Sequence, residues 1–173
     1  MRRRNSDPYA LANTQELKEY WTKQIRELGR NLFFVETGFV IASFDPSKRG
    51  TAETVLREFA TGRLVTSTYV ITEVVRRIVK SKAWDFLGPN GEQKVELALY
   101  FVFAWLSEKK VVVLCPPECV YHEATRIFRE CRIIGCDLTD VLSFVLVRGL
   151  EQDAILSQDS HFRALGLRTL YNE

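Results

Sequence analysis

The sequence predicts an α/β fold in which helices cover both faces of a mainly parallel sheet. Short apolar runs, typical of buried strands, alternate with longer segments whose apolar residues recur at helical spacing. Strands joined by helical crossovers pair in parallel and are covered on both faces. With 173 residues, of which 46% are hydrophobic, the chain is long enough for one domain with a substantial core.

The chain begins with a polar tail and an amphipathic helix. We expect residues 1–12 to be mobile, Asn13 to cap a helix over 14–29 with Glu16 completing a capping box, and Gly29 to end it. The apolar stripe of this helix packs either on the domain or on a partner. We therefore divide the chain into a tail and helix over residues 1–30 and a main domain over 31–173.

Strands and helices then alternate to the end of the chain. The expected strands are 31–35, 63–67, 111–115 and 154–157, with 168–171 as a candidate fifth. The expected helices are 38–44, 50–60, 69–80, 92–108, 118–132 and 140–150. Glycine and proline predict a loop at 84–91.

Composition narrows the function only a little. The net charge of +2 is too small to indicate a nucleic-acid partner by itself. No apolar run reaches the ~18–20 residues of a membrane span, and the start of the chain lacks the apolar core of a secretory signal, so we expect a cytoplasmic protein. The four cysteines have a loosely zinc-like spacing, but Cys115 ends an apolar strand, which favours free thiols.

Four carboxylates at the ends of apolar runs are the main functional signal: Glu36, Glu73, Asp140 and Asp159. A buried carboxylate without a partner is costly, and several together raise one another's pKa. A divalent cation such as Mg²⁺, which prefers oxygen ligands, removes both costs. Because Glu36 and Asp159 directly follow two strands, and the carboxyl ends of parallel strands share one edge, these two can meet in one crevice.

Each acid also has a local explanation. Glu36 can cap the next helix, although no Lys or Arg lies within five residues of it, which favours the metal role. Glu73 can pair with Arg76 and Arg77 on its own helix.

The two aspartates can likewise serve helix ends. Asp140 can gain from the dipole of a helix capped by Asp137 or Thr139, of which Asp137 is favoured, and Asp159 can cap a short helix. We interpret His161 as a surface or packing residue. Thr37 and Ser157 place hydroxyls beside the acids, where they can orient a water or a ligand.

Three segments resemble the motifs of PIN-domain nucleases. VETGFVIASFD resembles the opening strand of the family, and TSTYVITEVVRR resembles its second motif, which carries a helical Glu. CDLTDVLSFVLVRGLEQDAILSQDSHFRALG is similar to the third and fourth motifs of the toxin-like VapC branch. The resemblance covers roughly residues 31–170 and implies a five-stranded parallel sheet in a three-layer α/β/α sandwich.

The resemblance also implies an activity. It makes Glu36, Glu73, Asp140 and Asp159 the catalytic and metal-binding acids, with Mg²⁺ or Mn²⁺ as cofactor and endonucleolytic cleavage of RNA as the reaction. Arg76, Arg77 and Lys80 are our candidates for holding the RNA backbone. Family members often form homodimers, and many are toxins neutralised by a small antitoxin protein.

One departure from the family pattern keeps a second hypothesis open. The first acid of the family is normally Asp, and here it is Glu36, whose extra methylene moves the carboxylate by about 1.5 Å. The alternative is therefore a catalytically impaired PIN-fold protein that binds RNA or acts as a scaffold. A phosphatase or a flap-type DNA nuclease on the same acidic crevice is a third, weaker option.

Overall fold

The computed structural model describes residues 9–87, 91–130 and 135–171, and its centre is a five-stranded, all-parallel sheet. The strand order is β3-β2-β1-β4-β5. The strands are β1 (Leu32–Val35), β2 (Arg63–Ser67), β3 (Val112–Leu114), β4 (Ala154–Leu156) and β5 (Arg168–Thr169). The predicted α/β class and parallel sheet are confirmed, including the candidate fifth strand, although β3, β4 and β5 are shorter than expected.

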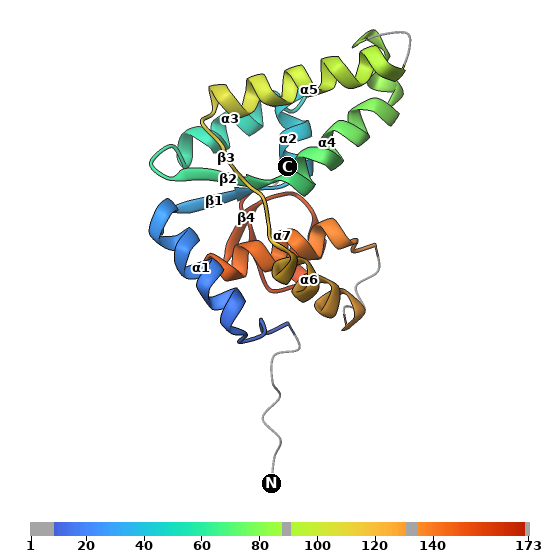
Figure 1. Ribbon diagram of the computed structural model, residues 1–173. Helices are drawn as coiled ribbons and strands as arrows, with labels where there is room; N and C mark the ends of the chain where they lie inside the picture. The colour runs from blue at the N-terminus through green and yellow to red at the C-terminus, as the bar shows by residue number, and fades with distance from the viewer. Residues whose placement is uncertain (1–8, 88–90, 131–134, 172–173) are drawn as a thin grey trace.

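Helices cover both faces of the sheet and make the three predicted layers. Figure 1 shows one group on one side, namely α2 (Thr37–Phe44), α3 (Arg49–Glu58), α4 (Thr68–Lys80) and α5 (Gly91–Glu108). The other side carries α1 (Gln15–Leu28), α6 (Glu118–Glu130) and α7 (Leu138–Gly149). The short helices η1 (Lys82–Leu87) and α8 (Ser160–Ala164) complete the described elements.

Helix α7 is the centre of one helical layer. Its residues from Asp140 to Val147 are all buried, and it packs closely against α6. A helix that is apolar on every side is stable only when it is enclosed in this way. Its first turn is therefore held in a fixed position relative to the sheet, which matters because that turn carries Asp140.

The strand order makes β1 a topological switch point. From β1 the chain crosses to β2 on one side, and it returns much later to β4 on the other side. Open parallel sheets bind ligands at such a switch point, outside the carboxyl ends of the strands. The backbone N–H of Glu36 donates to the carbonyl of Leu156 at 3.2 Å, so the ends of β1 and β4 are directly adjacent there.

Three local predictions were wrong. The N-cap of α1 is Thr14 and not Asn13, because the hydroxyl of Thr14 accepts from the N–H of Leu17. Part of the predicted loop at 84–91 is helical, since η1 extends to Leu87 and α5 begins at Gly91. For the predicted helix 118–132, the described part is α6, which extends to Glu130, and the last two positions lie outside the described residues.

The third error concerns the N-terminal tail, which we expected to be mobile over residues 1–12. In the described part, the N–H of Ala12 donates to Glu123 at 2.6 Å, and Arg126 donates to the carbonyl of Ala10 at 2.9 Å. Tyr9 also packs edge-on against Phe144. Residues 9–12 are therefore held in place by hydrogen bonds to α6 and packing against α7. Residues 1–8 lie outside the described range.

No helix in the described ranges combines the length and the apolar character that crossing a bilayer requires.

Gly149 lets α1 approach α7 closely, and this contact makes a testable prediction. A Cβ atom at Gly149 would lie 2.2 Å from the indole of Trp21. We expect Gly149→Ala to lower the melting temperature by about 5 °C, because overpacking a core typically costs one to three kcal/mol. Gly50→Ala is the matched control, since Gly50 lies in a helix with no atom near its would-be Cβ. Equal melting temperatures for Gly149→Ala and the native protein, measured by circular dichroism, would contradict this packing.

Candidate metal centre

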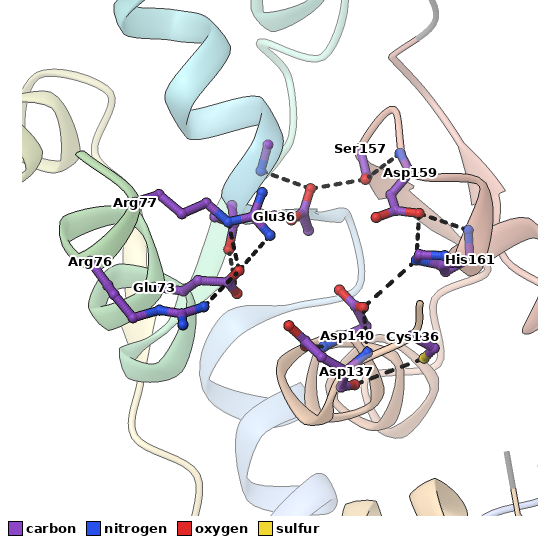
Figure 2. A network of polar contacts seen from close by, with 12 residues as sticks. Glu36, Glu73, Arg76, Arg77, Cys136, Asp137, Asp140, Ser157, Asp159 and His161 are labelled. Carbon is purple, nitrogen blue, oxygen red and sulfur yellow. Dashed lines mark hydrogen bonds and ion pairs between the residues drawn. The ribbon is translucent and has the colours of Figure 1, made fainter. Parts of the chain in front are cut away.

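The four predicted acids come together at the carboxyl edge of the sheet. Figure 2 shows Glu36, Glu73, Asp140 and Asp159 around one space, although each comes from a different element. Their charges act on one another: Asp140 raises the pKa of Glu36, and Asp159 and Glu73 raise that of Asp140. The prediction that these distant acids share one pocket is therefore in agreement with the geometry.

Glu36 ends β1 and caps α2. Its Oε2 atom accepts from the N–H of Gly38 and from the hydroxyl of Ser157, both at 2.9 Å. The side chain is only 6% exposed, and burial raises its pKa to about 7 despite those two donors. The carboxylate folds back over Gly38, where a Cβ atom would lie 3.1 Å from Oε2. A glycine at this position thus makes room for the longer acid.

Glu73 is paired within its own helix. Ser67 caps α4 through the N–H of Val70, which sets the start of the helix and hence the direction of Glu73 one turn later. The carboxylate accepts from Arg77 Nε at 2.7 Å, lies 3.8 Å from an Arg76 nitrogen, and accepts from the Thr37 hydroxyl at 3.2 Å. The ion pair that we weighed as a local explanation is therefore present, and it borders the acidic pocket.

Arg77 brings positive charge into the pocket. Burial lowers the pKa of its guanidinium, but the charges of Glu73, Glu36 and Asp137 outweigh this and raise it overall. Its charge also opposes the rise in the pKa of Glu36. Lys80, the remaining basic candidate, lies further along α4 on an exposed face.

Asp140 belongs to a capping box at the start of α7. The Asp137 side chain accepts from the N–H of Asp140 at 3.0 Å, and Asp140 Oδ2 accepts from the N–H of Asp137 at 2.9 Å. Asp137 is thus the N-cap, as predicted. Burial is the main cause that raises the pKa of Asp140 to about 6, and the nearby acids add to it. The cap fixes one oxygen of Asp140 without neutralising its charge.

Asp159 and His161 complete the site from α8. Asp159 caps this helix by accepting from the N–H of His161 at 2.8 Å, and its own N–H donates to the Ser157 hydroxyl at 3.0 Å. His161 Nδ1 lies 2.8 Å from Asp159 Oδ1 and 3.8 Å from Asp140 Oδ2. Gly135 leaves space for the ring, since a Cβ atom there would lie 3.0 Å from His161 Nε2.

We did not predict that His161 belongs to the site. It was interpreted as a surface or packing residue, because a histidine two residues after a helix cap is locally unremarkable. Its position depends on the tertiary contact of α8 with α7, which carries Asp140. Two signals in the sequence were its closeness to Asp159 and its place in the DSHF segment, which resembles the fourth motif of the family.

The arrangement fits a divalent cation. One ligand atom each from Asp140, Asp159 and His161 lies within 4.8 Å of the others, and Glu36 borders them. His161 Nδ1 is the ring nitrogen that faces the carboxylates of Asp159 and Asp140. Carboxylate oxygens are the ligands that Mg²⁺ and Mn²⁺ prefer.

Comparison with known proteins agrees with this geometry. The sequence matches the PIN domain family over residues 33–167. The fold is similar to the crystal structure of Mycobacterium tuberculosis VapC20, described as a toxin that cleaves the sarcin–ricin loop, with a TM-score of 0.60 and 19% identity over 78% of this chain and 95% of that one. At this identity the likeness shows the fold alone. No curated protein matches the chain.

The buried acids predict a pH-dependent stability. The pKa of Glu36 rises from 4.5 to about 7 on folding, so the folded state binds its proton more tightly than the unfolded state does. The contribution of Glu36 to the free energy of unfolding is fully present below pH 4.5 and is lost as the pH rises toward 7. Without divalent ions, we expect the native protein to lose roughly 3 kcal/mol across this window relative to Glu36→Gln. The free energy of unfolding of both proteins is measured by denaturant titration at each pH. If it changes with pH in the same way in both, the pKa of Glu36 is not raised in the folded protein.

Cation binding should reverse that loss. At pH 7.5, Mn²⁺ at a hundred times its dissociation constant should stabilise the native protein by about 2.7 kcal/mol. Asp140→Asn should lose this gain while keeping its fold, because the Asn oxygen can still accept from the N–H of Asp137. Equal Mn²⁺ stabilisation of both proteins would place the ion elsewhere.

Proposed function

The chain belongs to the PIN-domain family, and from this premise we propose that it is a metal-dependent endoribonuclease. The observation that carries the proposal is the convergence of four acids at the switch point beside β1. Two of them have a raised pKa, which is typical of functional sites where charge awaits a ligand. Family membership alone establishes a nuclease-type domain, and the substrate and reaction are our proposal.

In this proposal, Glu36, Asp140 and Asp159 hold Mg²⁺ or Mn²⁺, with His161 beside them and Glu73 at the border of the pocket. A bound divalent cation supplies positive charge that offsets the charge developing on a phosphodiester and makes water more acidic. Ser157 fixes Glu36, and Thr37 fixes Glu73, each through a hydroxyl hydrogen bond. Both hydroxyls therefore keep an acid in a single rotamer.

The basic residues of α4 are suited to hold the RNA backbone. Arg76 and Arg77 are about half exposed, at 56% and 50% of their side chains, and Glu73 orients both. A guanidinium that an acid already orients loses less freedom when it binds a phosphate. Lys80 extends the positive charge along the same helix.

RNA is the substrate class that we propose, in line with the RNA-cleaving toxin that shares the fold. We also propose that the chain acts as a homodimer and is neutralised by a small antitoxin protein. Helix α5 supports a protein contact because it exposes large apolar side chains: Val95, Leu97, Tyr100, Phe101 and Phe103.

The decisive test is cleavage of RNA with and without metal. We expect the native protein to cleave RNA with Mg²⁺ or Mn²⁺, and EDTA to abolish this. Asp140→Asn should lower the rate at least about a hundredfold, as loss of a key electrostatic group does. Asp153→Asn is the matched control, because Asp153 is exposed and pairs only with Arg168 among its described contacts. Persistent cleavage in EDTA, or preference for DNA or phosphomonoesters over RNA, would refute the proposal.

The longer acid at Glu36 supports a second candidate, a PIN-fold protein with impaired catalysis that binds RNA or acts as a scaffold. One oxygen of Glu36 is already engaged by two donors, and a pKa of about 7 leaves much of the group protonated at neutral pH. Against this, Gly38 leaves room for the carboxylate of Glu36, and Ser157 donates a hydrogen bond to it.

Glu36→Asp separates the two candidates. If the pocket is built for Glu36, the shorter side chain gains nothing, and we expect the cleavage rate of Glu36→Asp to stay at or below that of the native protein. A rate about tenfold or more above native would mean that the natural glutamate suppresses catalysis and would favour the impaired protein. Single-turnover cleavage at saturating Mn²⁺ measures this difference directly.

A further inference from the structure

Two tyrosines from different helices stack on each other, and one of them lies about one helical turn before Glu73. Tyr69 lies in the first turn of α4, four residues before Glu73, and Tyr121 lies in the first turn of α6. Residues four apart in a helix lie on the same face, about 5–6 Å from each other. Tyr69 therefore flanks the acid that borders the pocket.

The two rings are nearly parallel and widely spaced. Their centroids are 6.4 Å apart and their planes differ by 26°. The other described ring pairs are tilted or edge-on, with interplanar angles of 44° or more. At 6.4 Å, near the long end of the range for aromatic contacts, two nearly parallel rings overlap little. Tyr121 is also 39% exposed.

Helix α4 carries three kinds of group in a row. Tyr69, Glu73 and Arg76 occupy positions i, i+4 and i+7, so an aromatic ring, a site acid and an exposed cation follow one another along one face. Each helical turn advances about 5.4 Å. Proteins that bind single-stranded nucleic acid combine stacking rings for the bases with cations for the backbone. Duplex RNA keeps its bases stacked inside and offers no ring face to such a platform.

We propose that Tyr69 and Tyr121 form a platform on which an unpaired RNA base stacks beside the acidic pocket. The substrate class is then single-stranded RNA, a loop or a tail, with the stacked base near the phosphate to be cleaved. The position of the base near a cleaved phosphate rests on the proposed function, but the stacking of the base on the tyrosines does not. A simpler role for the pair, fastening α4 to α6, needs only the bulk of the two side chains.

The test uses RNA binding without cleavage. A single-stranded oligonucleotide carries 2-aminopurine at successive positions and is titrated with protein in EDTA at fixed ionic strength. We expect strong quenching at one position, because a stacked 2-aminopurine loses its fluorescence. The Tyr69→Phe, Tyr121→Phe double variant keeps both rings and should match the native protein. The Tyr69→Leu, Tyr121→Leu double variant keeps apolar bulk, and it should lose the quenching and raise Kd about tenfold.

Two controls make the result specific. Phe128→Leu should bind like the native protein, because Phe128 is as exposed as Tyr121, at 39%, but lies seven residues further along α6. The same sequence as a duplex should bind about tenfold more weakly than the single strand. If the double leucine variant is unstable, Tyr121→Leu alone replaces it, since Tyr121 is the more exposed ring.

The outcomes are distinct from those of the cleavage test. The platform is refuted if the leucine variant quenches 2-aminopurine and binds RNA as well as the native protein does. It is also refuted if duplex and single strand bind equally well, even if the protein cleaves RNA. Ring-dependent quenching in a protein that does not cleave RNA would support the platform and refute the endoribonuclease.

Discussion

The repulsion among buried carboxylates is the constraint on which the rest of the site depends. Glu36 and Asp140 each have a raised pKa because they are removed from water and because the other acids lie nearby. Such a cluster costs free energy in the folded protein unless positive charge meets it. The cluster lies at the switch point beside β1, where open parallel sheets typically bind ligands.

Local contacts reduce this cost without removing it. Glu36 and Asp140 lie at the N-termini of α2 and α7, where the helix dipole favours negative charge, and Asp159 caps α8. Glu73 has Arg77 as its partner. In the sequence alone, a helix cap and a metal ligand are competing explanations of the same acid. The structure shows that the capping roles are real, and because the pKa values of two acids stay raised, a cap and a ligand can be the same residue.

The sequence predicted the framework well because its signals are local. Alternating apolar runs were enough for the parallel sheet, and the positions of Glu36 and Asp159 after strands were enough to bring them to one edge. Glu73 and Asp140 were selected because they lie at the ends of apolar runs, and the family resemblance pointed to the same residues, although both have good local explanations on their helices. The roles of all four acids in catalysis stay a prediction.

What could not be predicted depends on contacts between distant segments. Ala12 binds Glu123 across 111 positions of the sequence, and no local pattern signals that contact. The place of His161 depends on how α8 meets α7. Gly38 is similar: it looks like an ordinary helix residue, and only the structure shows that its missing side chain makes room for Glu36.

A crystal grown with Mn²⁺ at pH 7.5, with data collected to show the anomalous scattering of manganese, tests the central claim most directly. We predict an anomalous peak bounded by Glu36, Asp140 and Asp159, with the carboxylates directed toward it. An empty pocket at saturating Mn²⁺, with the four acids satisfied by arginine and backbone N–H groups alone, would contradict the account.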